Sequence, residues 1–552
     1  MPLGVLEHNA SAGHHVPGTV FLDTHTSTVE LELSGLKKGT GKNSEVILVP
    51  QPSNDPNDPL NWPLWQRDCI LLLYCFCTVC VTGGVGPLLS SMAIPIITEF
   101  KITFTDFSLL TGYQLCAAGA TGILISAMAR KFGKRPTSLF SMSAVLAGCI
   151  WAGRAESYGS LVGARVLQGL GLAFFESITF AIVGDLFHVH ERGKRMAIYV
   201  MAQSGIANLP SAIAGKITMD LGWRWVFYLL SLFVGIGWLC CVLFGWETAF
   251  NRSAMYNLDT NSMDISAAHD EFSDKLVSDK INEKTMTEEN LNKTMTESSA
   301  PVYTRESFFE RIKPYHGSFS DESLFKMIVR PFFLLINPVV AWSILIVSFC
   351  SVWVIGISLV IAQIFSAPPY LLDTAQLGYI AFGPVVGGLL GCILCGALSD
   401  PIARWMTRRN NGVYEPEFRL PLMLLLPIVS TIGYFIFGNA ITQGKSPIAA
   451  AAMWGLVFVS VQVAAVSTGA YIVDAFRDIS VEAFIISMTV KNFLWFGFSY
   501  FLNNWLAAKG AASMFDTIGG IQLGLSLTTI PIYVFGKRIR AWWHTNNALR
   551  TT

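Results

Sequence analysis

The sequence predicts an all-α polytopic membrane protein with twelve transmembrane helices in two pseudo-symmetric six-helix halves. Three observations carry this prediction: the apolar composition, the alternation of charge between loops, and an internal repeat. Of the 552 residues, 52% are apolar and only 14% are charged. Apolar runs long enough to cross a bilayer recur along the chain, since ~30 Å of hydrocarbon at ~1.5 Å per helical residue requires about 20 residues.

Twelve such runs can be placed on the sequence. They lie at residues 68–89, 107–128, 137–154, 159–183, 197–219, 225–246, 337–362, 376–398, 420–441, 448–472, 483–505 and 518–536. The chain is therefore expected to comprise an N-terminal segment (1–65), a first six-helix half (66–248), a linker (249–330), a second half (331–536) and a tail (537–552).

The linker is polar and contains the short repeat "KTMTEEN…KTMTESS". Its composition is typical of disorder over most of its length. Within it, "RESFFERIKPY" has the pattern of a surface helix that lies on the membrane.

Basic residues alternate between the two sets of loops. One set carries clusters such as Arg130, Lys131, Lys134 and Arg135, whereas each loop of the other set has at most about one cation. Positively charged loops stay on the cytoplasmic side of a membrane. We therefore expect the basic loops and both termini to be cytoplasmic, which agrees with an even number of spans.

The two halves match at an offset of 270 residues. With that offset "ATGILISAMAR" (120–130) lies over "LGCILCGALSD" (390–400). Small residues recur every fourth position in both spans, a spacing that lets helices approach closely in lipid. They are Ala118, Gly122 and Ser126 in the first half and Gly383, Gly387 and Gly391 in the second. Generic helix packing would explain the spacing, but its repetition favours a duplicated architecture with a site between the halves.

Charged residues inside a bilayer are costly and usually functional. Arg165 and Glu176 lie in the fourth span, 11 residues apart, so they share one helix face about 16 Å apart along the axis. We predict that Glu176 carries a proton and that Arg165 tunes it or holds an anion. The alternative is a structural charge pair with neighbouring helices.

Lys491, with Asn492 beside it, is the charged residue near the middle of the eleventh span. It is expected to pair with a carboxylate in one conformation or to contact substrate. Lys216 lies near the end of the fifth span, close to Asp220, and can reach the interface instead. Other polar and aromatic residues within the spans are candidate substrate contacts, although helix packing explains each of them too. They are Gln114, Gln462 and Trp353.

No nucleotide-binding loop is present, so ATP hydrolysis in this chain is not expected to drive its function. "HVHE" (188–191) and "CILC" (392–395) have spacings seen in metal sites, but the first lies in a loop motif and the second within a span. We expect no metal, no cofactor and no enzymatic activity, because no paired acids or nucleophile with a base accompany the spans.

Several motifs carry a family resemblance. They are "RVLQG" (165–169), "DLFHVHERGKR" (185–195), "WRWVF" (223–227), "WET" (246–248), "GALSD" (396–400), "DPNDPLNWP" (55–63) and "VKNFLWFGFSY" (490–500). With these motifs the chain resembles the major facilitator superfamily, and within it the fungal drug:proton antiporter branch, over nearly its whole length. The resemblance implies the major facilitator fold and a role in proton coupling for the motif arginine, Arg165.

Two departures from the family pattern concern gating. The first-half turn has Arg130 where the family has Asp, and "GIANLPSAIAG" (205–215) keeps Pro210 but has Leu209 in place of a Gly. In the family the Asp of the turn helps to lock one state, so we expect Asp400 to serve that lock and an asymmetric gate in which Asp400 is more sensitive than Arg130. The predicted gating residues are Asp400, Gly396, Arg404, Arg130, Gly133 and Pro210.

The resemblance and the in-span charges together predict a proton-coupled secondary transporter of small organic molecules. Export of drugs or secondary metabolites is the leading case. Uptake of a nutrient or polyamine, or a nutrient sensor with a transporter fold, remains open. We expect a monomer in the plasma membrane whose partners are protons, a small-molecule substrate and lipid, without nucleic acid. One acid against two or three bases within the spans favours a neutral or anionic substrate over a dication.

Overall fold

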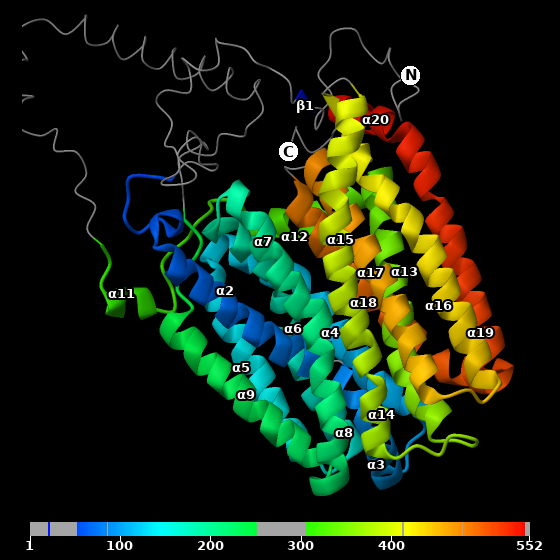
Figure 1. Cartoon of the computed structure of the whole chain (residues 1–552). Helices are drawn as coiled ribbons and strands as arrows, with labels where there is room; N and C mark the ends of the chain where they lie inside the picture. The colour runs from blue at the N-terminus through cyan, green and yellow to red at the C-terminus, as the bar shows by residue number, and fades with distance from the viewer. Residues whose placement is uncertain are drawn as a thin grey trace, which may run out of the picture.

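Figure 1 shows the computed structural model, in which two bundles of long helices lie side by side. The structure describes Val20–Phe21 and residues 52–84, 87–250, 305–410, 413–476 and 479–546. The first bundle is drawn in blue to green and the second in yellow-green to red. The C-terminal end of α15 lies at the upper end in this view. We call the end of the bundle that carries it and the loop of Arg130 to Arg135 the basic end.

The first half is built from helices that begin and end close to the predicted bounds. These are α2 (Leu64–Thr78) with η4 (Val79–Gly83), η5 (Pro87–Met92), α3 (Ala93–Phe100), α4 (Phe104–Phe132), α5 (Lys134–Gly153), α6 (Tyr158–Leu186), α7 (Val189–Val200), η6 (Met201–Gly205), η7 (Ile206–Asn208), α8 (Leu209–Leu221) and α9 (Trp223–Phe244).

The remaining helices belong to the linker and the second half. Their helices are α11 (Phe308–Ile312), α12 (Leu324–Phe333), η10 (Leu334–Ile336), α13 (Pro338–Phe365), α14 (Thr374–Ile380), α15 (Phe382–Arg409), η11 (Pro416–Leu424), α16 (Leu425–Thr442), α17 (Pro447–Ala475), α18 (Ser480–Ser499), α19 (Leu502–Leu527) and α20 (Thr529–Asn546). Two short strands, β1 (Val20–Phe21) and β2 (Val413–Tyr414), pair antiparallel beside α15.

Eleven helical segments among the described residues are long and apolar enough to cross a membrane. The predicted fifth span does not form one α-helix. It is divided into α7, η6, η7 and α8, with a π-helical turn at Met201–Gly205 and Pro210 in the first turn of α8. A proline removes a backbone N–H and clashes with the preceding turn. Together these pieces supply the twelfth crossing, and the all-α fold of two six-helix halves is confirmed.

The last two spans differ in their bounds from the prediction. The eleventh, predicted to end at 505, ends as α18 at Ser499. Helix α19 then changes direction at Gly510, whose φ of 77° lies in the left-handed region that favours glycine. Hydropathy does not resolve this bend, because the residues on both sides of Gly510 are mostly apolar.

The two halves repeat one packing scheme. Within the first half α4 packs on α6 and α5 on α9, and within the second α15 packs on α17 and α16 on α19. Between the halves α18 contacts α4, while α15 contacts η6 and α14 contacts α8. Second spans therefore occupy equivalent positions, each lying between its own half and the opposite one.

The small residues of the eighth span serve packing inside the second half. A Cβ at Gly383 would lie 2.0 Å from the Ala451 carbonyl oxygen, and one at Gly387 would lie 2.0 Å from the Gly455 carbonyl oxygen. The stripe thus lets α15 and α17 touch through their backbones, and it faces α17 rather than the interface between the halves.

We expect Gly387→Ala to destabilise the protein by about 1–3 kcal/mol, because the new methyl group has no room beside Gly455. The thermal unfolding midpoint of the purified protein in detergent measures this effect. Gly396→Ala on the same helix is the matched control, since a Cβ there meets nothing within 4 Å. Equal midpoints for the two variants would contradict the close approach of α15 and α17.

Part of the predicted linker has a defined structure. Residues 305–330 hold α11 and most of α12, which lie against the basic end of the bundle (Figure 1). The remainder of the predicted disordered region, 251–304, lies outside the described residues, so the prediction for that part stays untested.

Candidate functional site

Three polar residues meet between the two halves, near the middle of their helices. The Glu176 carboxylate on α6 accepts from the Lys491 ammonium at 3.1 Å and from the Asn492 side-chain amide at 3.1 Å, both on α18. The exposed fractions of the side chains are 9% for Glu176 and 20% for Lys491. The structure thus joins the predicted acid and the predicted base in one ion pair that links the halves.

Glycines on α4 explain how α18 comes so close. A Cβ at Gly119 would lie 3.2 Å from the Asn492 Cβ, and the Thr489 hydroxyl donates to the Gly119 carbonyl at 3.4 Å. At Gly122 a Cβ would meet the Met488 side chain. The α4–α18 contact therefore places Lys491 and Asn492 within reach of α6, which packs on α4 inside the first half.

Arg165 lies on the same helix as Glu176 but does not share its contacts. Its side chain is fully buried, and Nη1 donates to the Gln168 side-chain oxygen at 2.9 Å. Nε and Nη2 have no hydrogen-bond partner within the part of the chain that the structure describes. Unmade hydrogen bonds of a buried cation are costly. The Arg165 guanidinium thus keeps two nitrogens that can still donate hydrogen bonds.

The three other predicted substrate contacts lie in different surroundings. The Trp353 ring packs 4.7 Å from the Phe498 ring, centroid to centroid. Gln462 packs against Gly391, where a Cβ would lie 2.8 Å from its side chain, so it belongs to the α15–α17 contact. Gln114 is fully buried, and both its amide atoms lack hydrogen-bond partners among the described residues. Trp353 and Gln462 each leave an N–H unpaired on the same basis.

At the basic end, Arg130 makes a second ion pair between the halves. Its Nη1 lies 2.9 Å from Oε1 of Glu482, which is 5% exposed and belongs to the first turn of α18. Arg330 of α12 approaches the same oxygen at 3.9 Å. Arg130, the residue that departs from the family turn, thus pairs with an acid of the opposite half, Glu482. Sequence analysis did not single out Glu482, although its place near the start of a span opposite a basic loop was a usable signal.

Asp400 makes its contacts inside the second half. Its carboxylate lies 2.6 Å from Nη1 of Arg419, and Nε of Arg419 lies 3.0 Å from the Asp474 carboxylate. The Asp400 side chain is 66% exposed. Arg404 donates to the Asp400 backbone carbonyl at 3.4 Å. The contacts described for Asp400 and Arg404 are thus within the second half, and a Cβ at Gly396 would meet no atom within 4 Å.

Gly133 forms the sharp turn before α5, with φ at 97°. The Glu247 carboxylate fills the space beside it and accepts from the backbone N–H groups of Lys134 at 2.9 Å and Arg135 at 3.0 Å. A carboxylate at a helix N-terminus stabilises that helix. The acid of "WET" therefore anchors the basic turn, a role that the sequence alone did not reveal.

A buried charge cluster that was not predicted closes the basic end of the second half. Arg540 of α20 is fully buried and lies 2.8 Å from Glu417 and 2.9 Å from Glu415, while Lys537 lies 2.7 Å from Glu415. The Tyr471 hydroxyl also donates to Glu417, at 3.3 Å. The two acids of "EPEFR" (415–419) and the cations of "GKRIR" (536–540) are the sequence signal for this cluster, but their pairing depends on the packing of α20 against η11.

Two pseudo-symmetric bundles that meet along α4, α18, α15 and the broken fifth span, with an ion pair between them, define a polytopic membrane carrier. A model of the Major Facilitator Superfamily matches residues 74–496. The chain therefore belongs to the Major Facilitator Superfamily and is a membrane transporter of small molecules.

Individual relatives and one solved structure agree with this assignment. An MFS-type transporter of Schizosaccharomyces pombe is 26% identical over 96% of this chain and 93% of its own length. Protein HOL1 of Saccharomyces cerevisiae is 23% identical over 96% of both chains. Multidrug transporter DTR1 of Candida glabrata is 27% identical over 65% of both. The crystal structure of a mutant of the peptide transporter POT covers 86% of this chain and 94% of its own, with a TM-score of 0.55 at 13% identity. It supports the fold alone.

Proposed function

We propose that this protein is a proton-coupled secondary transporter that works by alternating access, with its basic end facing the cytoplasm. The observation that carries the proposal is the contact of Glu176 with Lys491 and Asn492, because a carboxylate that can bind a proton joins α6 of the first half to α18 of the second. Protonation of Glu176 removes the charge that attracts Lys491. Proton binding and the separation of α6 from α18 are then linked, as coupling requires.

Arg165 has a supporting role in this proposal. Its guanidinium remains charged at all relevant pH values, and its side chain is buried with two nitrogens unpaired among the described residues. When the halves move, these donors can bind an anionic group or a carboxylate that Lys491 has released. The sequence family and the burial both support a place for Arg165 in proton coupling.

We assign substrate contact to Lys491, Asn492, Trp353, Gln114 and Gln462. The indole N–H of Trp353, the carbonyl oxygen of Asn492, the N–H₂ group of Gln462 and both amide atoms of Gln114 lack partners among the described residues, so a substrate with complementary polar groups would satisfy them. The Glu176 carboxylate is already neutralised by Lys491. A neutral or anionic, fairly apolar substrate therefore fits better than a dication.

Export of drugs or secondary metabolites across the plasma membrane is the direction we favour. A similar protein is named a multidrug transporter, and the motifs of the chain resemble the drug:proton antiporter branch. Uptake of a nutrient or polyamine would use the same ion pair with the opposite gradient. Saturable, tight uptake of spermidine by vesicles that is lost in Glu176→Gln would favour that alternative, and a protein without measurable flux of any substrate would favour a sensor.

Glu176→Gln is expected to abolish flux driven by a pH gradient and to leave substrate exchange at equal pH measurable. Proteoliposomes with an imposed gradient of either sign, screened over candidate substrates, measure both quantities and the direction. Asp220→Asn is the control, because that acid is about half exposed and paired with Lys216 on the same helix. Gradient-driven flux that is unchanged in Glu176→Gln would exclude Glu176 as the proton carrier.

A further inference from the structure

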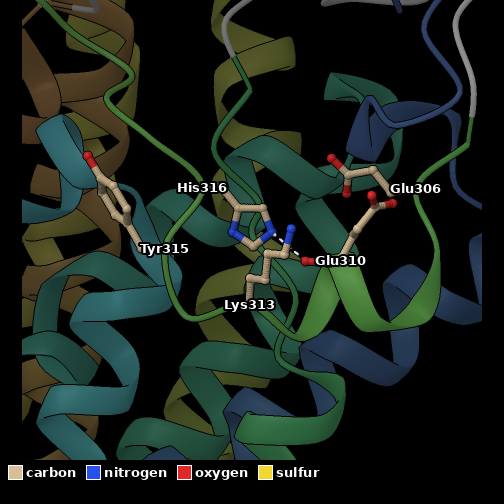
Figure 2. Close-up of a pocket in the computed structure, with 5 residues that line it drawn as sticks. All are labelled: Glu306, Glu310, Lys313, Tyr315 and His316. Carbon is tan, nitrogen blue, oxygen red and sulfur yellow. Dashed lines mark hydrogen bonds between the residues drawn. The ribbon is translucent and has the colours of Figure 1, made fainter.

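The described end of the linker, residues 305–333, forms a strap across the basic end. It begins with α11, whose first turn is closed by a capping box: the Glu310 N–H donates to the Ser307 hydroxyl at 3.3 Å, and the Ser307 N–H donates to the Glu310 carboxylate at 2.9 Å. Figure 2 shows the shallow pocket of about 340 Å³ beside this turn, where His316 folds back to lie 3.1 Å from the Glu310 carbonyl oxygen. The strap is therefore a folded element.

An arginine that packs over two tryptophan rings anchors the strap to the first half. The Arg311 guanidinium lies 5.4 Å from the Trp62 ring centroid and 5.0 Å from that of Trp246, and the side chain is buried. Trp62 precedes the first span and Trp246 follows the sixth. A desolvated arginine over an aromatic ring is held more tightly than one at an exposed site.

A second arginine, Arg135, binds the C-terminal end of α11. Arg135 is fully buried, and its guanidinium donates to the carbonyls of Ile312 at 2.7 Å and Lys313 at 2.9 Å. It also donates to the carbonyls of Val242 at 2.7 Å and Gly245 at the end of α9. One side chain thus joins the C-terminal ends of two helices, where a cation is favoured.

The strap then follows the basic turn of the first half. The Phe319 N–H donates to the Lys131 carbonyl at 2.8 Å, and the Lys131 ammonium donates to the Glu322 carbonyl at 3.1 Å. The contacts described for residues 305–322 with the bundle are all to the first half or to the segment before it, so this part of the strap is attached to the first half.

The last part of the strap crosses to the other half. Helix α12 contacts both α4 and α18, with Met327 and Pro331 buried. Arg330 of α12 lies 3.9 Å from Oε1 of Glu482. Arg130 lies 2.9 Å from the same oxygen. Two cations of different origin, one from the basic turn and one from the strap, therefore converge on one acid of the second half.

We propose that the strap is a latch that holds the basic end closed, with Arg311 as its anchor and Arg330 as its release point. The inference rests on the proposed alternating-access function, because only that function requires the basic end to open. When the second half rotates away, α18 withdraws Glu482 from Arg130 and Arg330 together. The strap, anchored by Arg311 and Arg135, stays with the first half. Both arginines are positioning residues of the gate and do not contact the transported molecule.

Hydrogen–deuterium exchange of the full-length protein in lipid nanodiscs tests the latch without any substrate. Arg330→Gln and Arg311→Ala are expected to raise exchange roughly tenfold over the first turns of α18 (480–490), because a weaker latch lets water enter the basic end more often. Lys326→Gln is the matched control on α12, since that side chain is exposed. It is expected to exchange like the natural sequence.

Unchanged exchange over 480–490 in both arginine variants, with faster exchange confined to 305–313, would overturn the latch. If Arg311→Ala yields no folded protein, Arg330→Gln decides the question alone. The two proposals fail in different ways. If the natural protein shows no flux driven by a pH gradient, or if that flux is unchanged in Glu176→Gln, the proposed function is refuted whatever the exchange shows. Unchanged exchange at α18 in the arginine variants refutes the latch even in a protein that transports normally.

Discussion

Arg540→Met should destabilise the protein by about 3–5 kcal/mol, the largest stability effect expected for a single substitution here. Arg540 and Glu417 are both fully buried and lie 2.8 Å apart, and Glu415 lies 2.9 Å from the same nitrogen. Removing the cation leaves Glu417 without its buried partner and Glu415 with Lys537 alone, and an uncompensated buried charge is far more costly than a lost surface pair. The thermal midpoint in detergent and the yield of monodisperse protein measure the loss.

Arg538→Met is the control for this substitution, because Arg538 lies two residues earlier on the same helix with an exposed side chain. A loss of similar size in both variants would show that the tail tolerates no change of charge, and the cluster would then have no special role. A triple replacement of Arg540, Glu415 and Glu417 by apolar residues is expected to recover much of the stability, since apolar groups of similar shape need no partner.

Arg130→Glu should reduce transport by roughly tenfold or more, because it replaces the cation that lies 2.9 Å from Glu482 by a second acid at the gate between the halves. Glu482→Arg introduced into the same chain restores an ion pair of opposite polarity and should recover most of the flux. Flux in proteoliposomes measures both variants. If the double variant stays as impaired as the single ones, the pair does not act as a unit.

The contacts favour an order of sensitivity opposite to the one that the family turn suggested. Arg130 pairs with Glu482 across the interface, whereas Asp400 pairs with Arg419 inside its own half and is mostly exposed. Exposed ion pairs contribute little. We therefore expect Asp400→Asn to cost less transport than Arg130→Glu. A larger loss in Asp400→Asn would restore the order expected from the sequence.

Much of the fold could be read from the sequence because the bilayer imposes a simple rule. A span must satisfy its backbone internally over about 20 apolar residues, so twelve apolar runs and an offset of 270 residues were enough for the two halves. The same rule marked Glu176 and Lys491, since charges are rare within spans. It also marked Arg165, although its partner Gln168 is uncharged.

The partners of these charges could not be read in the same way. Glu176 and Lys491 lie 315 residues apart, and nothing in their local sequence records that α18 packs on α4 through Gly119. Arg130 stands where the family has an acid, and only the packing of α18 shows that it pairs with Glu482. The break in the fifth span was also hidden, because hydropathy measures how apolar a segment is and not how its backbone turns.

The sequence by itself determined the membrane class, the number of crossings, the two halves and the charged residues that need a function. The spans and their charged residues follow from the composition of short segments. The two halves follow from the repetition of a motif along the chain. Only the tertiary structure decided which charges meet: Glu176 with Lys491, Arg130 with Glu482, and Arg311 with two tryptophans. The physical reason is that an ion pair depends on distances of about 3 Å between helices far apart in the chain, and those distances are set by the packing of whole helices.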